Sequence, residues 1–176
     1  MQALRLEKFT VQTSARNEMV EVTDRLRRIV ASRNLAEGML VAETVAGQVS
    51  PPIDYAGVPR VTFSTPEVAS VGLTEAQAKD QGHEVVVNKF PFNATAKGLI
   101  HGLGGMVKVV AAKDGPVLGI HLVGARVTDL VAEAMLIYNW EALPVDVAQF
   151  IHPHPTLSEA IGEAHMTLAG RRFHQL

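Results

Sequence analysis

The sequence GMVKVVAAKDGPVLGIHLVG, residues 105–124, places two short apolar runs on either side of a polar turn. Met106–Ala112 and Val117–Val123 are rich in valine, leucine and isoleucine, and each has the length of a strand. Between them, the residues from Lys113 to Pro116 are of the types that favour tight turns. Strands joined by so short a connection pair in the antiparallel direction. The stretch therefore predicts a β-hairpin.

Further strands are predicted before this hairpin in the chain, and helices after it. The earlier strand-like segments are Arg60–Ser64, Ser70–Leu73 and Glu84–Phe90, and the first two are separated at Thr65-Pro66. A short helix is predicted to begin after Thr74, a good capping residue, and to end at Gly82. The glycine cluster at 98–105 is predicted to be a loop between strands. The later helices are predicted at Val127–Asn139, Val145–Phe150 and Thr156–Ala169. This order predicts an α+β fold, an antiparallel sheet with helices packed on it.

Residues 1–57 are predicted to form a helical N-terminal arm and linker, and residues 58–176 the compact domain. Apolar residues at helical spacing predict an amphipathic helix over about 17–31. A second helix is predicted over 35–47, because Gly47 provides a stop signal. The proline-rich segment from Ser50 to Pro59 has the composition of an extended linker.

The sequence FIHPHPTLSE, residues 150–159, carries the clearest candidate for chemistry. Histidine is the side chain best suited to move a proton near neutral pH. Glu159 follows His154 by five residues and falls in the first turn of a predicted helix that Thr156 or Ser158 can cap. A carboxylate within reach of the second ring nitrogen would fix the tautomer and stabilise the imidazolium. The pattern predicts a His154–Glu159 acid/base pair.

Two other interpretations of this stretch remain open. The prolines can serve only as helix-entry residues, with both histidines in solvent. The spacing of His152 and His154 can also serve a metal, because alternate residues of an extended segment share one face. The chain has no cysteine, and no further histidine is fixed nearby by motif spacing, so the sequence predicts no metal site.

Composition restricts the class of protein. The chain has 176 residues, of which 47% are hydrophobic, and this is enough apolar material for a proper core. Its net charge of −2 gives no case for nucleic-acid binding. No unbroken apolar run reaches eighteen residues, so no membrane span is predicted. The N-terminus lacks the pattern of a signal peptide, and a cytoplasmic location is expected.

Three segments, in order, carry a resemblance to a known family. They are PRVTFSTPEVASVGLTE at 59–75, KFPFNA at 89–94 together with the hairpin, and FIHPHPTLSEAIGEA at 150–164. Over residues 36–176 the chain resembles the C-terminal dimerisation domain of the pyridine nucleotide–disulfide oxidoreductases, and among them most closely the dihydrolipoamide dehydrogenases. Mercuric reductases resemble it less, because their C-terminal cysteine pair is missing here. Glutathione reductases share His-Pro-Thr but differ over the following Leu157-Ser158-Glu159.

The resemblance implies a homodimer in which each chain serves the partner subunit. It implies that His154 is the catalytic base and Glu159 its supporting carboxylate, both acting at a disulfide and flavin of the other subunit. The His154 backbone is then expected to face that flavin, with a cis bond between His154 and Pro155. The complete enzyme is expected to use FAD and NAD.

This chain by itself is expected to be inactive. It has no cysteine to form a redox disulfide, and no G-x-G-x-x-G element to bind a dinucleotide. No tightly bound cofactor is therefore predicted for the chain alone, and its possible partners include a full-length flavoprotein subunit. The alternative function is a stand-alone, non-catalytic dimerisation module. Flavin absorbance in material copurified with candidate partners would discriminate the two.

Overall fold

The computed structural model of the chain describes residues 35–48 and 52–171, with the side chains of the first segment described from residue 38 onward. The chain divides into one unit that ends at Ile53 and a second that begins at Asp54. In the first unit, helix α2 (Leu35–Val45) ends just before Gly47, whose φ of 75° is favourable for glycine. This confirms the helix predicted up to Gly47. The helix predicted at 17–31 lies outside the described residues.

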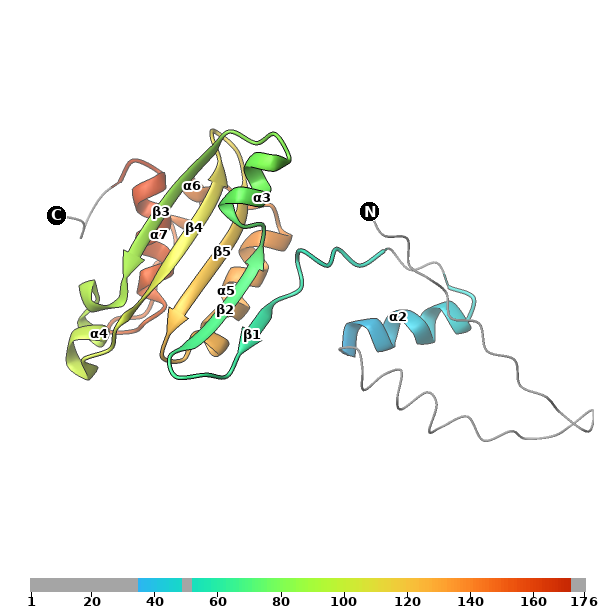
Figure 1. The fold of residues 1–176 in the computed structure, drawn as a ribbon, viewed down its shortest axis with the longest axis horizontal. Coiled ribbons are helices and arrows are strands. Elements are labelled where there is room, and N and C mark those ends of the chain that lie inside the picture. Colours follow the sequence, from blue (N-terminus) through green and yellow to red (C-terminus); the bar gives the residue numbers. More distant parts are fainter. Residues whose placement is uncertain (1–34, 49–51, 172–176) are drawn as a thin grey trace, which may run out of the picture. The chain divides into compact units, whose positions relative to one another are not determined.

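The second unit is built on a five-stranded antiparallel sheet with the order β1-β2-β5-β4-β3 (Figure 1). Its strands are β1 (Arg60–Thr62), β2 (Glu67–Gly72), β3 (Val85–Pro91), β4 (Gly105–Ala112) and β5 (Val117–Gly124). The predicted hairpin is present as β4 and β5, which pair Val107 with Leu122 and Val109 with Ile120. In its turn, Asp114 adopts a φ of 58°, a conformation that Asp tolerates better than most residues.

Helices cover one face of this sheet. α5 (Val127–Asn139) packs on β2 and β5, and α7 (Glu159–Leu168) packs on β3 and β4, with the short α6 (Pro144–Val147) against α7 (Figure 1). The core lies between these helices and the sheet, and its largest fully buried apolar side chains include Phe90, Phe92, Val107, Ile120 and Ile161. The predicted α+β fold is confirmed.

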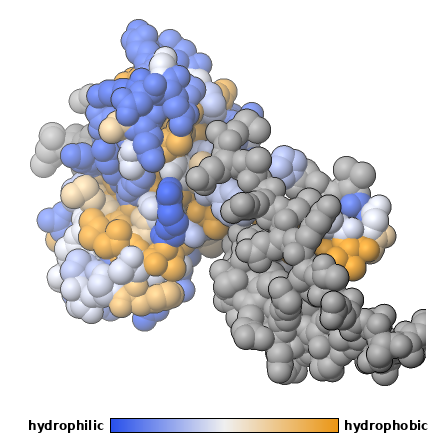
Figure 2. Space-filling model, turned by 45° about the vertical axis from the view of Figure 1, so that its right-hand side comes forward, coloured by the Kyte–Doolittle hydropathy of each residue, from blue (hydrophilic) through white to orange (hydrophobic). Residues whose placement is uncertain are grey.

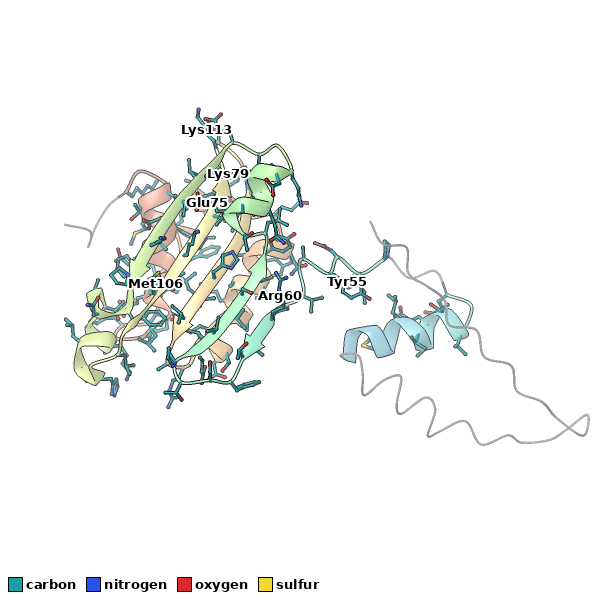
Figure 3. The ribbon with its side chains drawn as sticks, viewed as in Figure 1. Tyr55, Arg60, Glu75, Lys79, Met106 and Lys113 are labelled. Atoms are coloured by element: carbon teal, nitrogen blue, oxygen red, sulfur yellow. The ribbon has the colours of Figure 1, made fainter. Side chains whose placement is uncertain are left out.

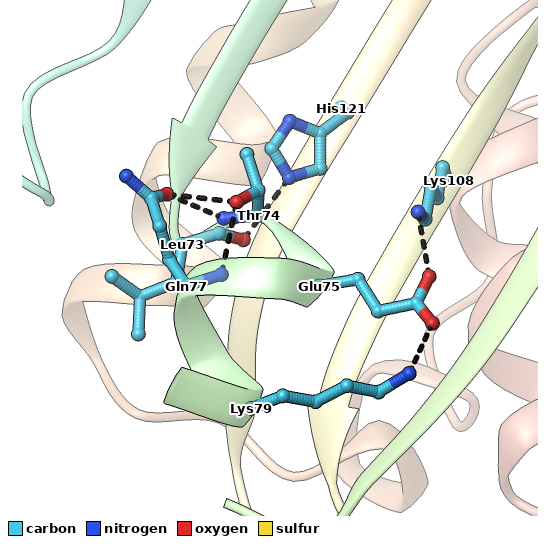
Figure 4. A network of polar contacts seen from close by, with 7 residues as sticks. All are labelled: Leu73, Thr74, Glu75, Gln77, Lys79, Lys108 and His121. Carbon is cyan, nitrogen blue, oxygen red and sulfur yellow. Dashed lines mark hydrogen bonds and ion pairs between the residues drawn. The ribbon is translucent and has the colours of Figure 1, made fainter. Parts of the chain in front are cut away.

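The opposite face of the sheet carries helix α3 (Glu75–Asp80) at one end and a polar network beside it (Figures 3 and 4). As predicted, Thr74 caps this helix, accepting a hydrogen bond from the Gln77 backbone N–H at 3.2 Å. The Glu75 carboxylate contacts Lys79 of its own helix at 2.8 Å and Lys108 of β4 at 2.9 Å. Hydrogen bonds from Lys79 and then Lys108 lower the pKa of Glu75 to about 2. The network ties α3 to the central strands.

Several sequence predictions need correction. The glycine-rich segment predicted as a loop contains helix α4 (Ala96–His101), preceded by a 3-10 turn η1 (Phe92–Ala94). The Thr95 hydroxyl oxygen accepts the Gly98 N–H at 3.0 Å and so starts the helix, and Gly102 ends it with a φ of 60°. A Cβ atom at Gly98 would clash with the Phe92 carbonyl, so here glycine permits a close approach of two backbone segments.

The ends of three other elements also differ from prediction. β2 begins at Glu67 rather than Ser70, because Glu67 already pairs with Gly124 of β5. α6 ends at Val147 rather than Phe150, because the Gln149 and Phe150 N–H groups bond to carbonyls only three residues back. α7 begins at Glu159 rather than Thr156, since the Thr156 N–H is bound by the Glu159 carboxylate.

Apolar side chains remain exposed on the second unit, and Figure 2 shows them gathered over the lower part of its visible face. Those exposed on the strands include Val61, Val68 and Met106, and those around the ends of α5 and α6 include Trp140, Phe150 and Ile151. Exposed apolar side chains that gather on one face are typical of interaction surfaces. Over residues 35–48 and 52–171, none of the helices has the length and apolar character needed to cross a membrane.

Candidate functional site

The His-Pro segment forms the connection between α6 and α7 and is held by its own hydroxyl groups. The Thr156 hydroxyl donates to the Pro153 carbonyl at 2.7 Å and lies 2.9 Å from the Ser158 hydroxyl. Ser158 occupies the residue before α7 but makes no side-chain cap, so the capping predicted there is wrong. The His154–Pro155 bond is cis, as expected from the resemblance, and Thr65–Pro66 is cis as well.

The structure brings His154 and Glu159 into contact. Nδ1 of His154 lies 2.8 Å from Oε1 of Glu159, and the other carboxylate oxygen accepts the Thr156 N–H at 2.8 Å. Burial alone would raise the pKa of Glu159. Its pKa is nevertheless lowered, because the Thr156 N–H, the hydrogen bond from His154 and the positive charges of His154 and His152 favour the carboxylate. Glu159 is thus an oriented anion.

The two side chains of this pair differ in exposure. The side chain of His154 is 69% exposed, whereas that of Glu159 is 22% exposed. With Nδ1–H donated to the carboxylate, Nε2 keeps its lone pair on an exposed ring. The arrangement can accept a proton from a group presented by another chain or a substrate, and it can stabilise the imidazolium that results. The catalytic role of the pair stays a prediction.

The same loop contributes to a second histidine–carboxylate pair, which was not predicted from the sequence. Nε2 of His152 lies 2.7 Å from Oε1 of Glu133 on helix α5. The hydrogen bond that the His152 ring donates to Glu133 raises the pKa of His152, against the opposing effect of burial. A signal existed in the sequence: Glu133 lies one helical turn from Leu130 and from Ile137, next to the apolar stripe of α5.

The rings of His152 and His154 therefore contact different carboxylates. A shared metal would need both rings and further ligands around one point. In the part of the chain that the structure describes, no three His, Cys, Asp or Glu side chains gather closely enough to hold a metal ion.

Two more histidines, His121 and His165, each contact a backbone carbonyl. His121 on β5 contacts the Leu73 carbonyl at 3.1 Å, and its pKa is lowered chiefly by burial (Figure 4). His165 on α7 is fully buried, and its Nδ1 lies 2.7 Å from the Ile161 carbonyl. Burial lowers the pKa of His165 to about 4. The His165 ring is therefore closed off from solvent, whereas the His121 ring is only partly buried.

The His-Pro loop also lines part of an open cleft of about 720 Å³. Lys97, His101, Arg126 and Asp129 line it, together with the loop residues from Pro155 to Ser158. Gly98, between these two lining residues in the sequence, is instead buried within α4.

Residues 58–165 match the family described as the pyridine nucleotide–disulphide oxidoreductase dimerisation domain. The match covers more than half of the chain. This chain belongs to that family. Its resemblance to the dihydrolipoamide dehydrogenases, predicted from three sequence segments, is confirmed by the relatives that follow.

The chain is 49% identical over 140 residues to a dihydrolipoyl dehydrogenase of Bacillus subtilis, covering 78% of this chain and 30% of that protein. It is 47% identical over 140 residues to the dihydrolipoyl dehydrogenase of Mycobacterium tuberculosis, covering 77% of this chain and again 30% of the relative. The chain thus spans about a third of the length of these curated relatives.

Solved structures share the fold. LpdA from Mycobacterium tuberculosis aligns with a TM-score of 0.73 at 23% identity, over 79% of this chain and 31% of that one. The flavoprotein disulfide reductase RclA from Escherichia coli aligns with a TM-score of 0.68 at 22% identity, over 74% of this chain and 31% of that one.

Proposed function

We propose that the chain is the dimerisation and acid/base domain of a dihydrolipoyl dehydrogenase-like flavoprotein, and that it supplies His154 and Glu159 to the disulfide and flavin site of a partner subunit. The observation that carries the proposal is the geometry of His154. Its Nδ1 is bound to an oriented carboxylate, while its side chain is 69% exposed and open to a group from another chain.

The reacting sulfur atoms must come from another part of a complete enzyme, because this chain contains no cysteine. The same holds for the cofactors, since the sequence has no glycine-rich element that opens a βαβ unit. When bound there, FAD and NAD would accept the electrons that leave the thiols. This chain's contribution is the His154 backbone beside that flavin and the His154 ring beside the sulfurs.

His154 performs one proton transfer in this scheme. Nε2 takes the proton of a substrate thiol, so that an S–H bond breaks and an N–H bond forms. The thiolate, and not the thiol, then attacks the disulfide. Glu159 holds the ring through Nδ1 and stabilises the positive charge that the transferred proton creates. The histidine therefore controls the supply of nucleophile.

Dimerisation is part of the same proposal. A base that serves a partner's disulfide acts only when two subunits meet, and symmetric two-fold contacts are the commonest way for identical chains to meet. The exposed side chains of Trp140, Phe150 and Ile151 are large and apolar, and all three precede His152 in the sequence. Sedimentation of the chain at micromolar concentrations is expected to show a homodimer, and a purely monomeric chain would contradict this.

The test is a chimera in which residues 36–176 replace the matching segment of the Bacillus subtilis relative. A flavin-loaded, dimeric chimera that oxidises dihydrolipoamide, and loses that activity with His154→Ala, supports the proposal. A flavin-loaded dimer without turnover would instead favour the non-catalytic dimerisation module. Flavin absorbance and sedimentation of each variant separate loss of assembly from loss of chemistry.

A further inference from the structure

We propose that His152 is a positioning residue for the exposed pair, which holds the His-Pro loop on helices α5 and α7 and maintains the charge of Glu159. This role depends on the proposed function of His154 and Glu159. It adds a second, inner histidine–carboxylate pair to that site. Three geometric observations carry it: a contact with α5, a close approach to α7, and a hollow that His152 shares with Glu159.

The first observation is the contact with α5. The His152 ring donates from Nε2 to Glu133 at 2.7 Å, and the two side chains are only 11% and 32% exposed. A charge-assisted hydrogen bond in such a place is stronger than its exposed counterpart. Because His152 lies two residues before His154, this contact restrains the loop immediately before the exposed ring.

The second observation is the place of the ring on α7. A Cβ atom added at Gly162 would lie 2.6 Å from Nδ1 of His152 and 2.7 Å from its Cε1. Glycine inside a helix costs about 1 kcal/mol relative to alanine. Here the missing side chain leaves the space that the imidazole occupies. The ring is therefore confined between the carboxylate on α5 and the backbone of α7, three residues beyond Glu159.

The third observation is the hollow that His152 shares with Glu159. His152 and Glu159 line the same small hollow of about 140 Å³, together with Gly162, Glu163 and Met166. The charged and titratable groups facing His152 are thus Glu133 from α5 and Glu159 and Glu163 from α7, with His165 deeper in the same helix. The Glu133 and Glu159 carboxylates both favour the charged ring, and burial keeps the nearby His165 neutral at ordinary pH. This environment favours the imidazolium.

The pKa directions agree with this geometry. The hydrogen bond that His152 donates to Glu133 raises the pKa of His152, and the charge of Glu159 raises it further, against burial. In return, the charge of His152 is among the causes that lower the pKa of Glu159. A positive charge thus lies between two carboxylates, one of which holds the His154 ring. Loss of His152 would make Glu159 easier to protonate and would release the loop.

The direct test is an NMR titration of the histidines in the 176-residue chain. The pKa of His152 is expected to fall in Glu133→Gln, which keeps the shape but removes the charge, and to fall less in Glu159→Gln. Glu84→Gln, at an exposed carboxylate of the same chain, is the matched control and should leave His152 unchanged. A His152 resonance that titrates identically in Glu133→Gln and in the unaltered chain would overturn the inference.

The second test uses the chimera and the pH dependence of kcat/KM. His152→Asn is expected to lower kcat about tenfold, less than the roughly 10²-fold loss that misplacement by an ångström can cause. It is also expected to move the acid limb of the profile to higher pH, because removing a positive charge beside the exposed pair favours the proton-bound form of that pair. Gly162→Ala should move the limb in the same direction by displacing the ring without removing a titratable group. Gly104→Ala, with open space around the added Cβ atom, is its control.

The outcomes separate the two proposals. Lower turnover in His152→Asn and Gly162→Ala with an unmoved acid limb would mean a purely structural histidine, and would overturn the positioning role. If His154→Ala kept full turnover, the proposed function would fail, whereas the response of His152 to Glu133→Gln in the isolated chain would still be measured. If His152→Asn does not fold, Gly162→Ala and Glu133→Gln carry the test.

Discussion

Two histidines of one short loop each pair with a carboxylate on a helix, and the two pairs differ in exposure although their distances are alike. His154 lies 2.8 Å from Glu159 and His152 lies 2.7 Å from Glu133, yet the first ring is 69% exposed and the second 11%. A short contact therefore does not define a role by itself. The exposed ring can meet a substrate of another chain, whereas the buried ring can only act on its neighbours. Substitutions should accordingly change turnover at His154 and both stability and turnover at His152.

The largest effect is expected for His154→Ala in the flavin-loaded chimera. Removal of a positioned base typically lowers the rate by about 10²–10⁴. Stability should change by no more than about 0.5 kcal/mol, because the side chain is mostly exposed. Steady-state turnover of lipoamide, with thermal unfolding measured on the same preparations, checks both parts.

His152→Ala is the matched comparison for that experiment, because the two residues share a His-Pro context. We expect it to retain more turnover than His154→Ala and to lose more stability. If His152→Ala abolished turnover while His154→Ala preserved it, the catalytic assignment would be wrong by one His-Pro repeat.

A second large effect is expected in the pH dependence of stability, through His165. Its folded pKa of about 4 lies below the ordinary 6.5, so the unfolded chain binds more protons between these values. This contribution to stability is present in full above about pH 6.5 and is lost as the pH falls towards 4. It amounts to about 3 kcal/mol, since one unit of pKa shift corresponds to about 1.4 kcal/mol. Urea unfolding at a series of pH values measures it.

His165→Phe should remove most of this acid sensitivity, and His83→Gln, at an exposed histidine, should leave it intact. His152 works in the opposite direction: its folded pKa is raised, so its contribution is complete below about pH 6.5 and is lost as the pH rises through the folded value. An unchanged slope between pH 6.5 and 4 in His165→Phe would rule out the buried neutral histidine as its cause. The carboxylates with lowered pKa act at lower pH, because their ordinary pKa is only 4.5.

A smaller loss is expected for Glu159→Gln in the chimera. The variant keeps the size of the side chain but removes the charge that supports the imidazolium. Hydrogen bonds to charged groups contribute about 1.5–3 kcal/mol, which corresponds to a loss of roughly 10- to 100-fold in turnover. The loss should therefore stay below that of His154→Ala. A Glu159→Gln enzyme with unchanged turnover would show that the carboxylate only orders the loop.

The sheet was predictable because its signals are local. Valine-rich runs around a turn predict the hairpin, and Thr74 with Gly82 marks both ends of one helix. The contact between His154 and Glu159 was also predictable, since five residues and one helix start separate them. The helix from Ala96 to His101 was missed because its glycine is required by the nearby Phe92 carbonyl, a tertiary contact.

The inner pair was missed for the same reason. His152 and Glu133 are nineteen residues apart, and only the packing of the loop on α5 brings them together. The confinement of the His152 ring by Gly162 likewise depends on α7 lying beside the loop. Local sequence thus predicted the pair that faces outward, whereas the pair that supports it depends on how distant elements pack.

The smallest effect is expected for Lys79→Ala on the opposite face of the sheet. This variant tests how far solvent exposure lowers the contribution of an ion pair to stability. Lys79 contacts Glu75 at 2.8 Å, the same distance as in the His154 pair, but the two side chains are 57% and 36% exposed. Exposed pairs one helical turn apart contribute about 0.3–0.5 kcal/mol, and salt weakens them. Lys79→Ala should therefore change the free energy of unfolding only slightly, and by less still in 1 M salt. Lys108→Ala, at the half-buried partner of the same carboxylate, should cost more, because its contact is shielded from water. Equal losses in the two variants, measured by urea unfolding, would show that distance rather than burial sets the value of these contacts.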